Sequence, residues 1–194
     1  MPQTELGYRR RNTLRYEGYD YTTPGAYFVT ICERYGRCVF GQVVDQLMIL
    51  NPLGQLAAQC LVDFGERHAD IKIDASVIMP NHAHILLWLH ADLEQNGQSV
   101  KVHKERKFGD AVAGSLSALM GGYKNSVTQR ARNQGLIPQG FLWQDNFHDY
   151  IVRGEQDLER IRSYIHANPA RWLADQLHPN APPNQFNRTW PRVP

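Results

Sequence analysis

Three things are scarce in this chain: long apolar runs, paired cysteines and an excess of charge. No apolar run approaches the roughly 18 residues of a membrane-spanning helix, so no membrane association is expected. Cys32, Cys38 and Cys60 are odd in number and include no CxxC pair, which argues against a disulfide framework or a structural zinc site. The arginine-rich start precedes no apolar segment, so we expect no secretory signal and a reducing, cytoplasmic location.

The composition is typical of one globular domain with a substantial core. The chain has 194 residues, of which 42% are hydrophobic and 21% charged, and its net charge of +2 identifies no partner. The distribution of charge is more informative, because two basic groups could contact DNA phosphates: Arg9, Arg10, Arg11 and Arg15 among tyrosines in residues 1–22, and Lys124, Arg130 and Arg132 on an expected helix. A solvated arm and a solvated helix face are the alternative interpretation of these groups.

Apolar periodicity predicts a mixed order of strands and helices. Strands are expected at 26–32, 38–44, 46–50, 71–79 and 82–89, with short strand-like segments at 141–144 and 147–152. Helices are expected at 52–69, 111–133 and 155–168. This order predicts an α+β domain over residues 23–170, with a mainly antiparallel sheet and helices packed on one face. Within this domain, residues 91–110 have the composition of a flexible surface loop. After it, the proline-rich tail at 171–194 should have little regular structure.

Two histidines at the start of an expected buried strand are the first candidates for metal ligands. His82 and His84 are separated by Ala83, and side chains two apart on a strand share a face. Their backbones would lie about 6.6 Å apart along the strand, so both imidazoles could reach one ion. A lone His-x-His pair is weak evidence, and it requires a further ligand and a reactive group from elsewhere in the chain.

The last expected helix offers both. Tyr164 and Asn168 lie four residues apart at the edge of its apolar stripe, so a phenol and an amide oxygen could face the histidines together. A tyrosine at the edge of the core and a residue that ends the helix before Pro169 are the structural alternatives. His148 is a candidate for the outer partner that a ligand imidazole usually needs.

Four short motifs occur in a fixed order: Tyr27-Phe28-Val29-Thr30, Met79-Pro80-Asn81-His82-Ala83-His84, Phe141-Leu142-Trp143-Gln144 and Tyr164-Ile165-His166-Ala167-Asn168-Pro169. Together they resemble the single-tyrosine HUH transposases of the IS200-like group, and above all the REP-associated tyrosine transposases. The resemblance covers residues 8–173.

The resemblance implies a ferredoxin-like domain that cuts and rejoins single-stranded DNA beside a hairpin, through a 5′-phosphotyrosine intermediate. By position, it implies Tyr164 as the nucleophile and His82, His84 and Asn168 as ligands of a divalent metal, with Mg²⁺ or Mn²⁺ expected. The imidazoles alone would fit Zn²⁺ equally well. It favours a monomer over a homodimer. A protein that binds DNA hairpins without cutting them is the main alternative, and a hydrolase of small phosphoesters is a more distant one.

Overall fold

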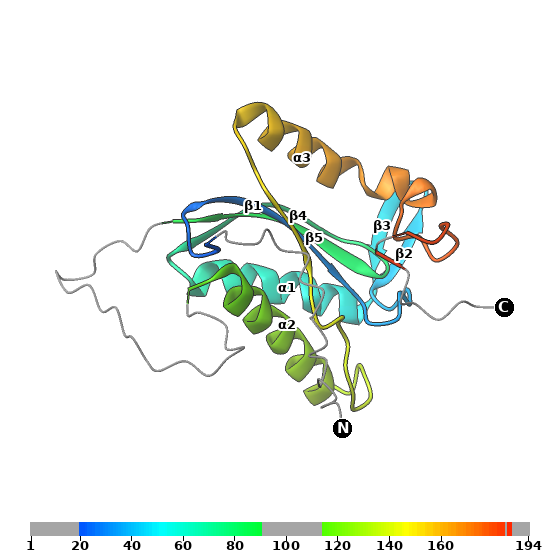
Figure 1. Ribbon diagram of the computed structural model, residues 1–194. Coiled ribbons are helices and arrows are strands. Elements are labelled where there is room, and N and C mark those ends of the chain that lie inside the picture. The colour runs from blue at the N-terminus through cyan, green and yellow to red at the C-terminus, as the bar shows by residue number, and fades with distance from the viewer. Residues whose placement is uncertain (1–19, 91–113, 185, 188–194) are drawn as a thin grey trace, which may run out of the picture.

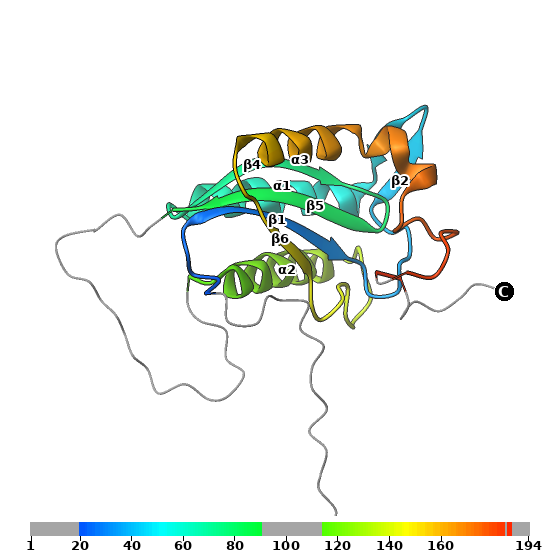
Figure 2. The same ribbon diagram turned by 45° about the horizontal axis from the view of Figure 1, so that its top comes forward.

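The centre of the molecule is a four-stranded antiparallel sheet, seen in a computed structural model that describes residues 20–90, 114–184 and 186–187 (Figures 1 and 2). Its strands are β1 (Gly25–Cys32), β4 (Ile71–Ile78), β5 (His82–Leu89) and β6 (His148–Ile151). They lie in the order β4-β5-β1-β6, and β1 pairs with β5 along its whole length. The β-branched and aromatic residues of β1 and β5 favour such central strands.

Two helices complete a ferredoxin-like core. These are α1 (Pro52–Arg67) and α2 (Leu116–Asn133), which lie side by side on one face of the sheet in Figure 1. A hairpin of β2 (Gly41–Val44) and β3 (Leu47–Leu50) is inserted between β1 and α1. The sequence β1-α1-β4-β5-α2-β6 and the strand order are those of the β-α-β-β-α-β arrangement, so the α+β class and the antiparallel sheet are confirmed.

The third helix departs from the prediction that the helices share one face. Helix α3 (Glu155–Ala167) packs on the opposite face of the sheet, above it in Figure 1, and a short 3₁₀ helix, η1 (Pro169–Ala174), follows. Its apolar stripe of Leu158, Ile161 and Ile165 contacts Leu86 of β5 in a second, smaller core. The sheet is therefore covered on both faces, and the site described below lies under α3.

An irregularity in β4 allows that strand to pack against the hydrophobic clusters on both faces of the sheet. A β-bulge between Ile73 and Ala75 shifts the register with β5. As a result Ile71 and Ile73 pack with α1, whereas Ala75 and Val77 pack with α3. Regular alternation along a strand would place all four residues on one face, and the extra residue of the bulge reverses the alternation beyond Ile73.

The helix that follows the hairpin begins as its sequence predicts. Asn51 accepts a hydrogen bond from the Gly54 amide at 3.0 Å, and Pro52 occupies the first turn, where its missing N–H costs nothing. The Asn51 amide also donates to the Val39 carbonyl at 2.8 Å, which fixes the helix start against the preceding loop.

In the described part of the chain no helix has both the length and the apolar character required to cross a bilayer.

Candidate metal and nucleophile site

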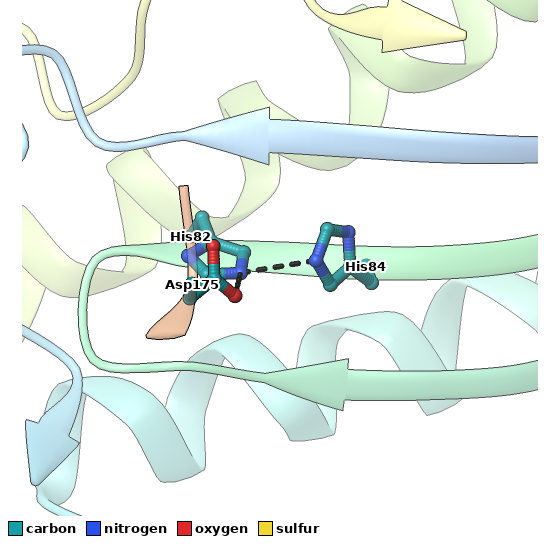
Figure 3. Close-up of side chains that lie close together, drawn as sticks. All are labelled: His82, His84 and Asp175. Carbon is teal, nitrogen blue, oxygen red and sulfur yellow. Dashed lines mark hydrogen bonds and ion pairs between the residues drawn. The ribbon is translucent and has the colours of Figure 1, made fainter. Parts of the chain in front are cut away.

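His82 and His84 lie on the face of β5 that is covered by α3. Both side chains are buried, and their Nε2 atoms lie 3.1 Å apart (Figure 3). The strand alternation expected from the sequence therefore does bring the two imidazoles together. Two nitrogen lone pairs repel each other at this distance, so either one Nε2 atom carries a proton and donates it to the other, or both atoms bind one metal ion.

The neighbours of the rings determine which nitrogens are available. The Asn81 amide nitrogen donates to the carbonyls of Gly36 at 3.0 Å and Leu177 at 2.7 Å, so its oxygen must face the His82 ring. That oxygen lies 2.8 Å from His82 Nδ1, which therefore carries the proton and leaves the Nε2 lone pair directed into the site. His84 Nδ1 lies 2.8 Å from the Thr30 hydroxyl, so both rings have the outer partner typical of metal ligands.

Helix α3 brings the predicted nucleophile to the histidines of the same chain. The Tyr164 hydroxyl lies 3.3 Å from His84 Nε2, and the two ring centroids are 5.2 Å apart. Phe28 of β1 meets the Tyr164 ring edge-on at 5.9 Å, which fixes the direction of the phenol. His166 points into solvent, as the helical spacing predicts.

Asn168 occupies the C-terminal cap of α3, and its side chain is almost completely buried. Its side chain acts to lower the pKa of both Tyr164 and Asp175, whereas its Oδ1 atom has no hydrogen-bond partner among the described residues. A buried carbonyl oxygen without a partner costs about 1–3 kcal/mol, so it needs an explanation. A cation beside the imidazoles would supply the missing partner.

Asp175 is the member of this cluster that the sequence did not indicate. It follows η1, within the proline-rich tail, and its Oδ2 atom lies 3.9 Å from His82 Nε2 (Figure 3). The ligand atoms of His82, His84 and Asp175 all lie within 4.8 Å of one another. In the sequence, Asp175 is distinguished only by its position seven residues after Asn168. That position does not predict that the chain turns back over β5.

Burial controls the charge states in the cluster. It lowers the pKa of His84 to about 3 and, together with the neighbouring His84 ring, holds the pKa of His82 well below its ordinary value. Both imidazoles are therefore neutral near pH 7 and able to bind a cation. Burial also raises the pKa of Asp175, and it raises the pKa of Tyr164 with help from the Asp175 charge. The charge of Arg171 acts in the opposite direction on Tyr164.

The cluster opens to a pocket of about 490 Å³. Apart from the residues above, its walls carry Tyr150 and Arg160, whose guanidinium carbon lies 5.9 Å from the Tyr150 ring centroid. Arg171 lines it as well, so two cations and a second tyrosine surround the approach to Tyr164. The arrangement suits an anionic substrate that must reach a phenol beside a cation site.

The basic residues expected on α2 do not line this pocket. The Lys124 amine donates to the carbonyls of Gln144 and Asp145, the latter at 3.1 Å. Arg130 pairs with Asp63 of α1 at 2.5 Å.

His148 lies opposite Thr30 in the sheet, and its ring centroid is 4.5 Å from that of Phe186, which lines the pocket. The hydrogen-bond partners described for the two histidines are Asn81 and Thr30, and an outer role for His148 stays a prediction.

The arginines of the amino-terminal arm (Arg9, Arg10, Arg11 and Arg15), most of residues 1–22 and the segment 91–110 lie outside the described residues. Their expected roles stay predictions.

The donor set fits a divalent metal. Two neutral imidazoles whose Nε2 atoms lie together, the unpartnered Asn168 oxygen and a buried carboxylate are donors that Mn²⁺, Mg²⁺ and Zn²⁺ accept. Oxygen ligands favour Mg²⁺ and Mn²⁺ more than imidazoles do.

The fold and this cluster define the class of structure: a ferredoxin-like domain with a His-x-His strand facing a tyrosine-bearing helix. The same fold occurs in a solved REP-associated tyrosine transposase bound to a REP hairpin, with a TM-score of 0.53 and 20% identity over 90% of this chain and 83% of that chain. A putative transposase from Deinococcus radiodurans, at TM-score 0.40 and 17% identity over 78% of this chain and 95% of that one, is too distant to support an argument.

The chain belongs to the same family as an uncharacterized protein of Haemophilus influenzae. The two are 30% identical over 173 residues, which is 89% of this chain and 95% of its relative. No protein-family model matches the chain.

Proposed function

We propose that this protein is a metal-dependent enzyme that cuts and rejoins single-stranded DNA beside a hairpin, with Tyr164 as the nucleophile. The observation that carries the proposal is the Tyr164 hydroxyl, 3.3 Å from the Nε2 atom of a buried histidine pair and beside an unpartnered amide oxygen. The hairpin is the ligand of the solved transposase that shares the fold, which supports the choice of substrate.

In the proposed reaction, the Tyr164 oxygen attacks the phosphorus of a DNA phosphodiester. The new bond from oxygen to phosphorus forms as the bond to the 3′ oxygen breaks, which leaves a 5′-phosphotyrosine and a strand that ends in a 3′ hydroxyl. The phenol gives up its proton and the 3′ oxygen takes one up, so no oxidant or ATP is needed. Attack by a 3′ hydroxyl reverses the step and rejoins DNA.

The residues around Tyr164 have separate parts in this scheme. His82, His84 and Asn168 would hold the metal, and Asp175 is positioned to add a carboxylate. The chemistry that a divalent ion would supply here is polarisation of a phosphate oxygen, which stabilises developing negative charge. Arg171 lies in the same pocket and favours the ionised phenol, whose pKa burial has raised. Phe28 holds the Tyr164 ring edge-on.

A monomer would be sufficient for this chemistry. Tyr164 reaches the histidines of its own chain, so no residue of a second copy is needed to bring nucleophile and ligands together. A single chain, with Tyr164 as its one catalytic tyrosine, should therefore form the adduct at a rate that does not depend on dimer formation.

The test is the formation of a covalent protein–DNA complex. The chain is incubated with Mn²⁺ and a labelled DNA hairpin with single-stranded flanks, and SDS gels are examined for a denaturation-resistant band. The proposal predicts a band that EDTA abolishes and that Tyr164→Phe lacks, while Tyr150→Phe, which changes the other tyrosine of the same pocket, retains it. Hairpin binding without any adduct would instead identify a non-catalytic DNA-binding protein.

The third ligand can be assigned separately. Asn168→Ala and Asp175→Asn are compared for Mn²⁺ affinity by calorimetry, without DNA. If Asn168 is a ligand, its loss weakens Mn²⁺ binding more than the loss of a surface asparagine such as Asn180. The reverse order, with Asp175→Asn alone abolishing binding, would replace Asn168 by Asp175 in the ligand set.

A further inference from the structure

A second groove, of about 610 Å³, shares no lining residue with the catalytic pocket. One wall is the loop that follows β1, and the other is the segment after α2 that runs from Leu136 to Leu142. Apolar side chains such as Leu53, Ile137 and Leu142 line it, together with Tyr35, Arg37 and Phe141. The function proposed above gives this groove no role.

Exposed aromatic rings and arginines alternate along it. Phe141 is 72% exposed and Tyr35 is 44% exposed, which is unusual for large rings beside a concave apolar surface. The Arg34 guanidinium carbon lies 4.8 Å from the Phe141 ring centroid and 5.8 Å from that of Tyr35. Arg37 lies 5.1 Å from the Tyr35 ring, so each ring is paired with a cation.

The loop that carries these residues is held in one shape. The buried Glu33 carboxylate accepts hydrogen bonds from the backbone amides of Tyr35 at 2.7 Å and Arg37 at 2.9 Å. The Arg34 amide donates to the Leu142 carbonyl at 2.9 Å, which ties the two walls together. A surface that is ordered before binding loses little conformational entropy when a ligand arrives.

The groove is lined by Arg37 and is flanked by Arg34, and each of these cations is paired with an acidic residue that lies outside the lining. None of its described lining residues is acidic. The acidic partner of Arg37 is the fully buried Glu33, and the partner of Arg34 is Asp145, which is 82% exposed and 3.2 Å away. The Arg37 side chain itself is 60% exposed, so its free face is available to an anion.

This loop is also connected to the metal site. The Gly36 carbonyl accepts a hydrogen bond from Asn81, whose oxygen orients the His82 ring. A strand held in the groove would therefore lie on the same rigid frame that positions the histidines.

We propose that this groove binds single-stranded DNA, with unpaired bases stacked on Tyr35 and Phe141 and phosphates beside Arg34 and Arg37. Aromatic faces and arginines along an apolar groove are the arrangement by which proteins bind single strands without reading their sequence. The choice of DNA over another single strand rests on the function proposed for Tyr164. The stacking surface itself rests on the groove alone.

The test uses a fluorescein-labelled oligothymidylate, which has no hairpin, and measures its binding by anisotropy without metal. Tyr35→Ala and Phe141→Ala are each expected to weaken binding about tenfold or more, because a stacked base contributes an interaction of this size. Tyr35→Phe keeps the aromatic face and should bind like the unchanged chain. Val62→Ala, at an exposed apolar residue of α1 outside the groove, is the matched control.

A variant that reports on contact directly is Phe141→Trp. Its indole fluorescence should fall as the oligothymidylate is added, and a duplex of the same length should cause a smaller change. Unchanged affinity in both alanine variants, or equal quenching by duplex and single strand, would overturn the proposal. These results do not depend on Tyr164: absence of a covalent adduct would refute the function proposed above while leaving the binding measurements intact.

Discussion

Replacing Asn81 by alanine should damage the metal site from outside it. The Asn81 side chain is fully buried and makes three hydrogen bonds: to the Gly36 carbonyl, to the Leu177 carbonyl and to His82 Nδ1. At about 1 kcal/mol each, their loss lowers the free energy of unfolding by about 3 kcal/mol. Loss of an outer partner also weakens metal binding about 10- to 100-fold, because the His82 ring is no longer oriented.

The two effects are measured separately. Urea unfolding without metal gives the stability, and calorimetric titration with Mn²⁺ at low temperature gives the affinity of the folded variant. Asn51→Ala is the matched control, since that asparagine also uses both ends of its amide, but far from the site. At about 1 kcal/mol for each of its two hydrogen bonds, its loss should lower the free energy of unfolding by about 2 kcal/mol and leave the Mn²⁺ affinity unchanged.

The variant Asn81→Asp distinguishes the effect on the orientation of the His82 ring from the effect on the stability of the fold. An aspartate keeps an oxygen beside His82 Nδ1 but places a second oxygen against two carbonyls, so stability falls while the ring keeps its partner. We expect its Mn²⁺ affinity to exceed that of Asn81→Ala. If Asn81→Ala folds and binds Mn²⁺ as tightly as the unchanged chain, the reasoning about the orientation of His82 is refuted.

Three further predictions concern packing, pH and the pocket. Gly121→Ala should raise the free energy of unfolding, measured by urea denaturation, by about 1 kcal/mol, because the added Cβ meets nothing within 4 Å and alanine favours a helix. Gly54→Ala should lower it, because the Phe40 carbonyl oxygen lies 2.1 Å from the added Cβ, and equal stabilities of the two variants would contradict the packing of α1. Burial raises the pKa of Cys32 from 9.0 to about 12, so the unfolded chain releases a proton that the folded chain keeps, and stability should fall with rising pH in this window by up to about 1.4 kcal/mol per unit. Urea titrations of Cys32→Ala should show a shallower fall, and parallel curves would exclude Cys32 as the cause. Arg171→Ala should slow adduct formation and shift its pH dependence upward, because the charge of Arg171 lowers the pKa of Tyr164; a pH profile like that of the unchanged chain would count against a role in the pocket.

The parts of the site that the sequence predicts correctly follow from local periodicity. Alternation along a strand places His82 and His84 on one face, and the turn of a helix places Tyr164 and Asn168 together. These rules need no knowledge of the rest of the fold. They do not say which face of the sheet a helix covers, and that is why α3 was expected beside the other helices.

The parts that the sequence does not predict depend on tertiary contacts. The bulge in β4 reverses the alternation of the strand's apolar residues, and the residue types at 73–75 do not predict a bulge. Asp175 reaches the site because the chain turns back after η1. The Trp172 side chain is buried there, and its ring centroid lies 6.1 Å from that of His82. The partners of the imidazoles, Asn81 and Thr30, come from a tight turn and a neighbouring strand.

The most direct test of the central claim is to locate the covalent bond. The denatured adduct formed with Mn²⁺ and the labelled hairpin is digested with nuclease and protease, and the peptides are sequenced by mass spectrometry. The proposed function predicts a nucleotide attached through its 5′ phosphate to the tyrosine at position 164. A nucleotide on any other residue, Tyr150 included, or an adduct that forms equally well in Tyr164→Phe, would contradict it.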